Sequence, residues 1–241
     1  MKLLLIAGMG ESVALAQQVS RLNGVEVVAV TEGRAVARAK PPVRVHEGRF
    51  ADDVAFLGFI EAEDFDLVID AAHPFQFRYG RVALASGRRY LRATRPLWTV
   101  RPEWSVQPAL ADVIAQLPQN ACVFSVMGRG MLRQFQTRAD VTVWCRQLDV
   151  HDTVFPLSKG GWEFGAGPFS VAQEVATFQR LNVTALVLRN TGSAAGFSKL
   201  EAAQQLGIHV ALISAPRWKI PKSVQVPFPE IMDVVQRFAD H

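Results

Sequence analysis

The chain has 241 residues, 49% of them hydrophobic and 20% charged, a composition typical of globular proteins and not of disordered or fibrous chains. Its longest apolar runs have the length of a strand, so we expect no membrane helix, and we interpret the opening run as a strand and not as a secretory signal. The formal net charge of +4 favours an anionic partner. The sequence contains no basic stripe or nucleic-acid module, and a polycarboxylate or phosphorylated small molecule accounts for the same charge.

Two cysteines, Cys122 and Cys145, each lie within an apolar run, which is typical of buried, reduced thiols. We therefore expect a cytoplasmic protein, either a monomer or a small homo-oligomer. No metal site is expected, because the cysteines stand apart and the histidines lack the spacing of metal ligands.

Short apolar runs alternate with amphipathic stretches along the first part of the chain, which predicts strands separated by helices. The predicted strands cover residues 2–8, 25–30, 43–48, 65–71 and 89–93. The predicted helices cover residues 11–22, 52–63 and 74–87. Strands that are apolar on both faces and separated by helices belong to a parallel sheet that is covered on both sides.

Residues 94–104, TRPLWTVRPEW, interrupt this alternation with two prolines and two tryptophans. We place the crossing into a second unit here, which predicts domains 1–98 and 99–241. Strands are then predicted at 121–127, 140–148, 184–190 and 208–214, and helices at 110–117, 170–181, 197–207 and, shortly, from residue 130. Ser170 is the predicted N-cap of its helix, with Glu174 near the capping-box position. A last amphipathic helix, 228–238, fits on either unit.

The predicted fold is therefore α/β, with two lobes of parallel sheet flanked by helices. Ligands of such sheets bind beyond the carboxyl ends of the strands, so the turns at those ends are the candidate sites. The first turn contains Gly8 and Gly10 before a helix, a pattern that suits a phosphate. A dinucleotide fingerprint has a third glycine where this chain has Val13, which leaves a plain tight turn as the alternative.

The second strand is followed by residues that discriminate between nicotinamide cofactors. Glu32 stands where a carboxylate accepts from the adenosine ribose, which favours NAD. Thr31 and Arg34 favour NADP, since an arginine there suits a 2′-phosphate.

The fourth strand leads into DAAHPFQFR, residues 70–78, where His73 either caps a helix that starts at Pro74 or forms a wall of a ligand site. Two further turns of this kind contain VMGRGM, residues 126–131, and LRNTGSAAGFSKLEAA, residues 188–203.

Several stretches, in order along nearly the whole chain, resemble one family, the precorrin-6A reductases of the cobalamin pathway. The matching residues are Gly8–Glu11, Asp70–Ala71 with His73–Phe75, Tyr90–Arg92, Arg95–Pro96 with Trp98, Gly128–Arg129, Gly167–Phe169, Asn190 with Gly192, and Lys199–Leu200 with Ala202–Ala203. The chain departs from the family pattern at Ala72, Leu188–Arg189, Thr191 and Ser193.

The resemblance implies two Rossmann-like lobes with a ligand cleft between them. It also implies an NADPH-dependent reduction of one double bond of a corrin precursor, a polycarboxylate that also accounts for the basic charge. The cofactor-binding residues it implies are Gly8, Met9, Gly10, Glu11, Ser12, Thr31, Arg34, Ala72, His73, Pro74, Phe75, Asn190, Thr191 and Gly192. The substrate-binding residues it implies are Arg78, Arg81, Gly128, Arg129, Arg133, Ser193 and Lys199.

His73 is the candidate general acid by residue type, because the charge of a histidine changes near neutral pH. Its alternative role is to orient the turn or to contact the cofactor. A non-catalytic binding protein for an anionic tetrapyrrole or nucleotide is the rival hypothesis. A reductase of small carbonyls fits less well, since neither Tyr79 nor Tyr90 has a lysine four residues later.

Overall fold

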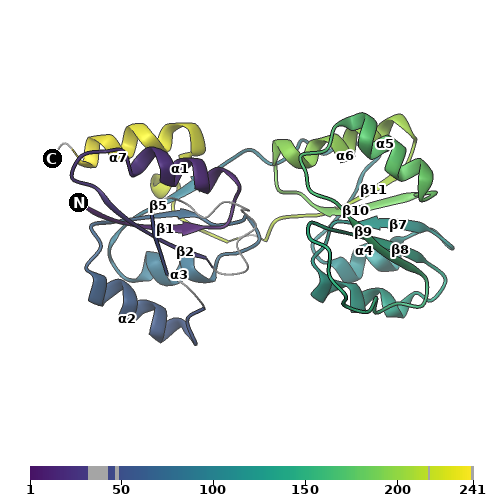
Figure 1. Cartoon of the computed structure of the whole chain (residues 1–241), viewed down its shortest axis with the longest axis horizontal. Helices are drawn as coiled ribbons and strands as arrows, with labels where there is room; N and C mark the ends of the chain where they lie inside the picture. Colours follow the sequence, from purple (N-terminus) through teal and green to yellow (C-terminus); the bar gives the residue numbers. More distant parts are fainter. Residues whose placement is uncertain (32–42, 47–48, 217, 240–241) are drawn as a thin grey trace. The chain divides into compact units, whose positions relative to one another are not determined.

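The computed structural model describes residues 1–31, 43–46, 49–216 and 218–239. The chain divides into two compact units, the first made of residues 1–95 and 217–241 and the second of residues 96–216 (Figure 1). Each unit is a parallel sheet with helices on both faces, which confirms the predicted fold class. No helix within the described ranges is both long and apolar enough to cross a bilayer.

The first unit is built on a six-stranded sheet of order β12-β5-β4-β1-β2-β3, in which every neighbouring pair is parallel. Its strands are β1 (Lys2–Ala7), β2 (Glu26–Thr31), β3 (Arg44–Val45), β4 (Leu67–Ala71), β5 (Arg89–Thr94) and β12 (Gln225–Pro227). Its helices are α1 (Glu11–Val19), α2 (Asp53–Glu63), α3 (Arg78–Ala85) and α7 (Ile231–Ala239), with short 3₁₀ helices η2 (Lys222–Val224) and η3 (Phe228–Glu230).

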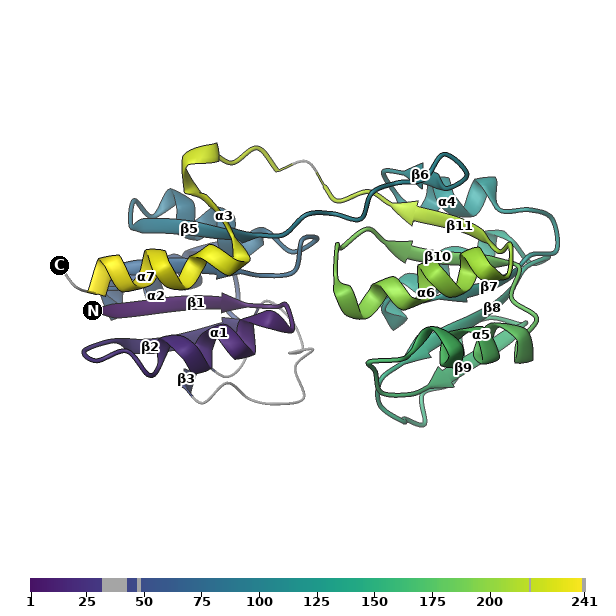
Figure 2. The ribbon, with the colours of Figure 1, turned by 90° about the horizontal axis from the view of Figure 1, so that it is seen from above.

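The two faces of the first sheet carry different helices, because side chains alternate along each strand. Leu3 and Leu5 of β1 face a core that includes residues of α1 and α7, whereas Leu4 and Ile6 face the core formed with α2 and α3. Helices α1 and α7 lie side by side on one face, although they come from opposite ends of the sequence (Figure 2).

The second unit repeats this plan with a sheet of order β6-β11-β10-β7-β8-β9, again parallel throughout. Its strands are β6 (Ser105–Gln107), β7 (Cys122–Ser125), β8 (Thr142–Gln147), β9 (Gly160–Phe164), β10 (Ala185–Arg189) and β11 (His209–Ile213). Its helices are α4 (Leu110–Gln116), α5 (Val171–Arg180) and α6 (Ala194–Gln205), with a longer 3₁₀ helix, η1 (Arg129–Thr137). Helices α5 and α6 cover one face, and α4 covers the other (Figure 1).

The boundaries between the units differ from the predicted ones. Trp98 packs in the core of the second unit, and the segment that follows residue 216 returns to the first. There β12 pairs with β5, and Ile231 and Val235 of α7 fill the core beside α1. The short edge strands β6, β9 and β12 were not predicted, since they contain glycine, proline or polar residues.

Two helix starts also differ from the sequence-based expectation. Helix α3 begins at Arg78 and not at Pro74, because residues 73–76 form a separate turn. The capping box of α5 joins Ser170 to Gln173, and Glu174 is buried instead.

Candidate functional site

In the first unit, the carboxyl ends of β1, β2, β4 and β5 lie at one edge of the sheet. Strand β1 has β2 on one side and β4 on the other, and the chain crosses from one face of the sheet to the other between them. This is the topological switch point, where open α/β sheets bind ligands. The turn after β1 and the turn after β4 therefore form the candidate site of this unit.

The turn at Gly8 packs directly on the turn that contains His73. A Cβ atom at Gly8 would lie 2.8 Å from the backbone nitrogen of His73 and 3.1 Å from the Cα atom of Ala72. By contrast, a Cβ atom at Gly10 would meet no atom within 4 Å, and Gly10 is exposed. Gly8 is thus needed for contact within the protein, whereas the space at Gly10 is open to a ligand.

The remaining residues of the first turn hold its shape. Met9 is buried in the core, and its carbonyl oxygen accepts hydrogen bonds from the hydroxyl and the amide of Ser12 at 2.6 Å and 3.1 Å. Glu11, in the first turn of α1, forms an ion pair with Arg95 at the end of β5. That ion pair offsets a negative charge beside the positive end of the helix dipole.

A buried carboxylate, that of Asp70, anchors the turn after β4 by hydrogen bonds. Asp70 is fully buried, and its Oδ1 accepts a hydrogen bond from the amide of Ala72 at 3.0 Å. Its Oδ2 accepts from the Tyr90 hydroxyl at 2.6 Å and lies 2.5 Å from a guanidinium nitrogen of Arg92. Arg92 also donates to the carbonyl oxygen of Ala72 at 3.2 Å. Both polar backbone groups of Ala72 are therefore fixed by residues of the sheet.

His73 begins a tight turn stabilised by its own side chain. Its Nδ1 accepts a hydrogen bond from the amide of Phe75 at 3.2 Å, and its carbonyl oxygen accepts from the amide of Gln76 at 2.7 Å. Two local hydrogen bonds thus close the turn of residues 73–76, and helix α3 begins only at Arg78. In the neutral ring, the bond accepted by Nδ1 places the proton on Nε2.

The other predicted site residues of the first unit follow β2 or belong to α3. Thr31 ends β2, and Arg34 lies outside the described residues. Arg78 forms an ion pair with Asp53 at 2.6 Å, and Arg81 is exposed on α3.

In the second unit, the side chain of Asn190 joins the turn after β10 to the segment around Trp98 by two hydrogen bonds. The carboxamide of Asn190 accepts from the Trp98 amide at 2.9 Å and donates to the Trp98 carbonyl oxygen at 3.0 Å. Gly192 has a φ of +67°, and a Cβ atom there would lie 1.9 Å from the carbonyl oxygen of Pro96. The side chain of Asn190 therefore stabilises the local structure, and its role in cofactor binding stays a prediction.

The remaining predicted residues of the second unit differ in burial and in their partners. Arg129 donates to the Thr153 hydroxyl at 3.1 Å, next to the exposed Gly128, and Arg133 is exposed. Ser193 caps α6 by accepting from the amide of Gly196 at 3.2 Å. Lys199 is buried and pairs with Glu174 at 3.0 Å. Its ammonium therefore already has an internal partner.

The sequence-based prediction gave no role in the site to three buried charged residues: Asp70, Arg92 and Arg146. Asp70 and Arg92 fix the turn after β4, Arg146 pairs with Glu174, and each follows buried residues of its strand, in LVIDA, RYLRAT and TVWCRQ. A charge inside a run that is otherwise buried needs a partner or a functional reason, so this pattern was the available signal.

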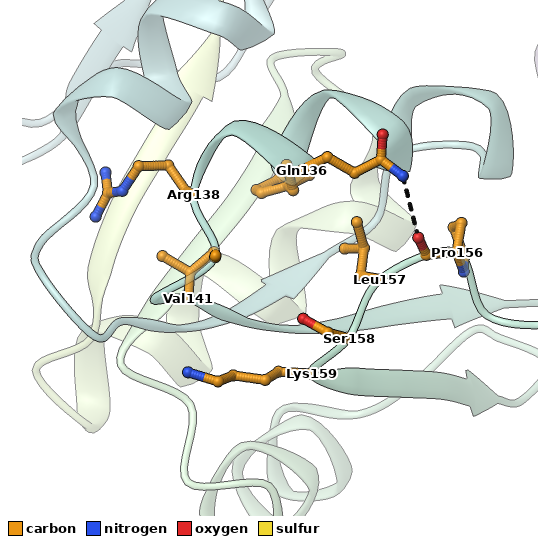
Figure 3. Close-up of a pocket in the computed structure, with 9 residues that line it drawn as sticks. Gln136, Arg138, Val141, Pro156, Leu157, Ser158 and Lys159 are labelled. Carbon is orange, nitrogen blue, oxygen red and sulfur yellow. Dashed lines mark hydrogen bonds between the residues drawn. The ribbon is translucent and has the colours of Figure 1, made fainter.

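A pocket of about 250 Å³ lies elsewhere in the second unit (Figure 3). It is lined by the end of η1, by Val141 before β8 and by residues 156–159 before β9. These residues lie at the amino ends of the strands, opposite the candidate edge. Among the described residues, no three His, Cys, Asp or Glu side chains are grouped so as to hold a metal ion.

Comparisons with known proteins identify the family and support the fold. The family model described as "Precorrin-6x reductase CbiJ/CobK" matches residues 2–238. The precorrin-6A reductases of Rhodococcus erythropolis and Rhodobacter capsulatus are each 30% identical over 222 residues, which is 89% of this chain and 89% and 88% of theirs. The solved structure of the CobK precorrin-6A reductase superposes with a TM-score of 0.86 at 28% identity, covering 98% of this chain and 96% of that one.

Proposed function

The chain belongs to the precorrin-6x reductase family and is an oxidoreductase, and we propose that it uses NADPH to reduce one ring double bond of precorrin-6A to the dihydro form in cobalamin biosynthesis. The observation that carries the cofactor proposal is the contact of Gly8 with the backbone of His73. It brings two turns together at the switch point of a Rossmann-like sheet, which is where dinucleotides bind.

The residues of the first unit fit a dinucleotide. Gly10 leaves open space at the start of α1, where backbone amides and the helix dipole attract phosphate oxygens. The ion pair of Glu11 with Arg95 removes a charge that would repel them. Thr31 ends the neighbouring strand, and we assign recognition of the 2′-phosphate to it and to Arg34.

When bound, NADPH supplies the hydride, and a proton must be added at the neighbouring carbon of the macrocycle. The turn of His73, Pro74 and Phe75 borders the proposed cofactor site, and Asp70 and Arg92 fix the backbone of the preceding residue, Ala72. A turn held in this way positions the reacting rings and excludes water. If His73 delivers the proton, the proton leaves from Nε2, since Nδ1 accepts from the Phe75 amide.

The substrate is a macrocycle with several carboxylate arms, and the basic balance of the chain suits it. Arg129 and Arg133, at and after the turn that follows β7, and Arg78 and Arg81 of α3 are the proposed partners of those arms. Each is at or near the carboxyl edge of its own sheet.

The experiment that tests this function is anaerobic mixing of the protein with precorrin-6A and NADPH, while the absorbance of the macrocycle and of NADPH is followed. Loss of one NADPH for each macrocycle reduced is the expected result. NADPH at one hundred times its dissociation constant is expected to raise the free energy of unfolding by about 2.7 kcal/mol. A macrocycle that binds without oxidation of NADPH would identify a binding protein instead.

A further inference from the structure

The turn after β7, in the second unit, is held by two buried side chains of the sheet. The amide of Met127 donates a hydrogen bond to Ser125 Oγ at 3.3 Å, and the thiol of Cys145 donates to the Met127 carbonyl oxygen at 3.3 Å. Ser125, Met127 and Cys145 are 0%, 2% and 0% exposed, so neither bond competes with bulk water. Both polar backbone groups of Met127 are thus bound by side chains, directly before the exposed Gly128.

The turn after β4, in the first unit, is held by the same arrangement. Asp70 binds the amide of the second residue after it, Ala72, as Ser125 binds the amide of the second residue after it. Arg92, the partner of Asp70 in the register of β4 and β5, binds the carbonyl oxygen of Ala72. Cys145 is the partner of Ser125 in the register of β7 and β8. In both units, a pair of facing side chains on two neighbouring strands therefore fixes the residue that leads into a candidate site turn.

The thiol of Cys145 is a donor with a defined acceptor. Its Sγ atom accepts a hydrogen bond from Gln147 Nε2 at 3.2 Å, and it lies 3.8 Å from the carbonyl oxygen of Arg146, farther than from that of Met127. Burial raises the pKa of Cys145 to about 11, although the hydrogen bond from Gln147 lowers it. The thiol is therefore protonated at neutral pH, and its proton points to the nearer oxygen, that of Met127.

The oxygen that Cys145 binds belongs to the peptide between Met127 and Gly128. A peptide is planar, so fixing its carbonyl oxygen also fixes the direction of the Gly128 amide. Gly128 is the N-cap of η1, and its carbonyl oxygen accepts from the amide of Met131 at 2.9 Å. Because a glycine does not restrict its own backbone, the direction in which η1 begins, with Arg129 as its first residue, depends on this peptide.

We propose that Cys145 is a positioning residue for the reduction, whose thiol fixes the peptide between Met127 and Gly128 and thereby directs Arg129 towards the substrate. The proposal rests on the proposed function for the role of Arg129. Ser125 acts with Cys145 on the other polar group of Met127. Without the thiol, the buried carbonyl oxygen of Met127 has no donor, and the turn moves to find one.

The test compares Cys145→Ala with Cys122→Ala, the matched control. Cys122 is the first residue of β7, at its amino end, and its thiol also donates to a backbone carbonyl oxygen, that of Leu181 at 3.2 Å. We expect the KM for precorrin-6A to rise at least fivefold in Cys145→Ala and to stay within twofold in Cys122→Ala. The KM for NADPH is expected to stay within twofold in both variants. Equal rises in the two variants, or no rise in Cys145→Ala, overturn the proposal.

Two further variants separate the hydrogen bond from the volume of the side chain. Cys145→Ser keeps a donor at the same place, so its KM for precorrin-6A is expected to stay within twofold of the unchanged protein. A KM in Cys145→Ser as high as in Cys145→Ala overturns the proposal. Ser125→Ala removes the other bond to Met127 and is expected to raise the same KM. Combining it with Cys145→Ala is expected to add less than the product of the two single effects, since both act on one residue.

Hydrogen exchange of residues 126–133, followed by mass spectrometry, tests the same link without a ligand. We expect faster exchange there in Cys145→Ala and an unchanged rate in Cys122→Ala, and an unchanged rate in both overturns the proposal. If Cys145→Ala fails to fold, Ser125→Ala replaces it in each comparison with Cys122→Ala.

The dissociation constant of precorrin-6A, measured by quenching of tryptophan fluorescence, distinguishes this proposal from the proposed function. If the unchanged protein does not oxidise NADPH in the presence of precorrin-6A, the proposed function fails. The exchange rates and the dissociation constants of the Cys145 and Cys122 variants then still decide whether Cys145 positions the turn.

Discussion

The hydroxyl group of Tyr90 donates a hydrogen bond to Asp70 Oδ2 at 2.6 Å, from one buried strand to the next. Burial, together with the neighbouring Asp70 carboxylate, raises the pKa of Tyr90 far above its usual range. The phenol therefore stays protonated, and a hydrogen-bond donor, at neutral pH. Because Asp70 in turn holds the amide of Ala72, this bond joins the sheet to the turn that contains His73.

Tyr90→Phe removes this donor and leaves Asp70 with Arg92 and the Ala72 amide. A hydrogen bond to a charged group contributes about 1.5–3 kcal/mol, so we expect a loss of this size in the free energy of unfolding, measured by urea denaturation. The turn after β4 loosens at the same time. We therefore also expect the KM for NADPH to rise several-fold.

The control for this change is Tyr79→Phe, in the same unit. The Tyr79 hydroxyl accepts from the amide of Phe50 at 3.2 Å, and its ring stacks on Phe56 of α2, with ring centroids 4.2 Å apart. The variant is expected to lose stability without a change in the KM for NADPH. Equal effects of both variants on the KM would contradict the link between Tyr90 and the turn.

Gly80 of α3 faces the same buried group from the helix side. A Cβ atom there would lie 2.0 Å from Asp70 Oδ2 and 3.0 Å from the Tyr90 hydroxyl. Gly80→Ala must push Asp70 away from Arg92, and separating a buried ion pair costs about 3–5 kcal/mol. Gly58→Ala in α2 is the control, because its Cβ would meet no atom within 4 Å. It is expected to stabilise the protein by about 0.5–1 kcal/mol, and urea denaturation of both variants measures the difference.

Much of the fold follows from periodicity alone. The strands at the centres of both sheets are continuous apolar runs, and helices α3, α5 and α7 show a clear 3.6-residue pattern. Three of the edge strands escaped prediction, because a three-residue strand with two polar residues, such as Ser105–Gln107, is fixed by its neighbour and not by its own sequence.

The site was predictable in part. Glycines and the HPF stretch marked the turns, since those residues follow predicted strands. Their contacts were not predictable, because the pairing of Asn190 with Trp98 joins residues 92 positions apart. The role of Glu174 was also misjudged: its position suggested a cap, whereas Gln173 fills that role and Glu174 neutralises buried cations.

The two glycines of the first turn are expected to respond differently to alanine. Gly8→Ala forces the turn away from the backbone of His73, so we expect a loss of about 1–3 kcal/mol in stability as well as weaker NADPH binding. Gly10→Ala fits the unliganded protein, and its methyl group occupies the space assigned to the cofactor. We expect unchanged stability without ligand and a thermal shift by NADPH that is largely lost. A normal NADPH shift in Gly10→Ala would place the phosphates elsewhere.

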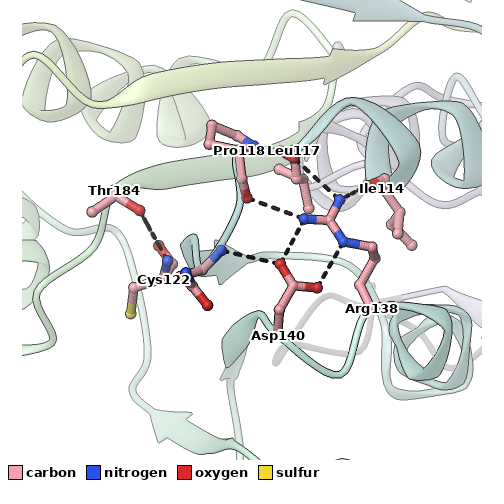
Figure 4. Close-up of polar contacts among 8 residues, drawn as sticks. Ile114, Leu117, Pro118, Cys122, Arg138, Asp140 and Thr184 are labelled. Atoms are coloured by element: carbon pink, nitrogen blue, oxygen red, sulfur yellow. Dashed lines mark hydrogen bonds and ion pairs between the residues drawn. The ribbon is translucent and has the colours of Figure 1, made fainter.

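The carboxylate of Asp140 makes the stability of the second unit depend on pH in the acidic range. Arg138 pairs with it through two bonds of 2.8 Å, and the amide of Asn120 donates to it at 3.0 Å (Figure 4). The Arg138 guanidinium first, and that amide second, hold the pKa of Asp140 well below its usual range. A lowered folded-state pKa contributes stability that is present above the unfolded value of about 4 and is lost as the pH falls through the folded value.

We therefore expect the free energy of unfolding of the unchanged protein to fall below about pH 4. Asp140→Asn is expected to be less stable at pH 7, with a smaller decline on acidification, because the amide cannot titrate. Urea denaturation between about pH 2 and pH 7 measures both slopes. Asp112→Asn is the control, since Asp112 is an exposed carboxylate in the first turn of α4 in the same unit. Parallel pH profiles of the unchanged protein and Asp140→Asn would show that the ion pair with Arg138 contributes nothing to acid sensitivity.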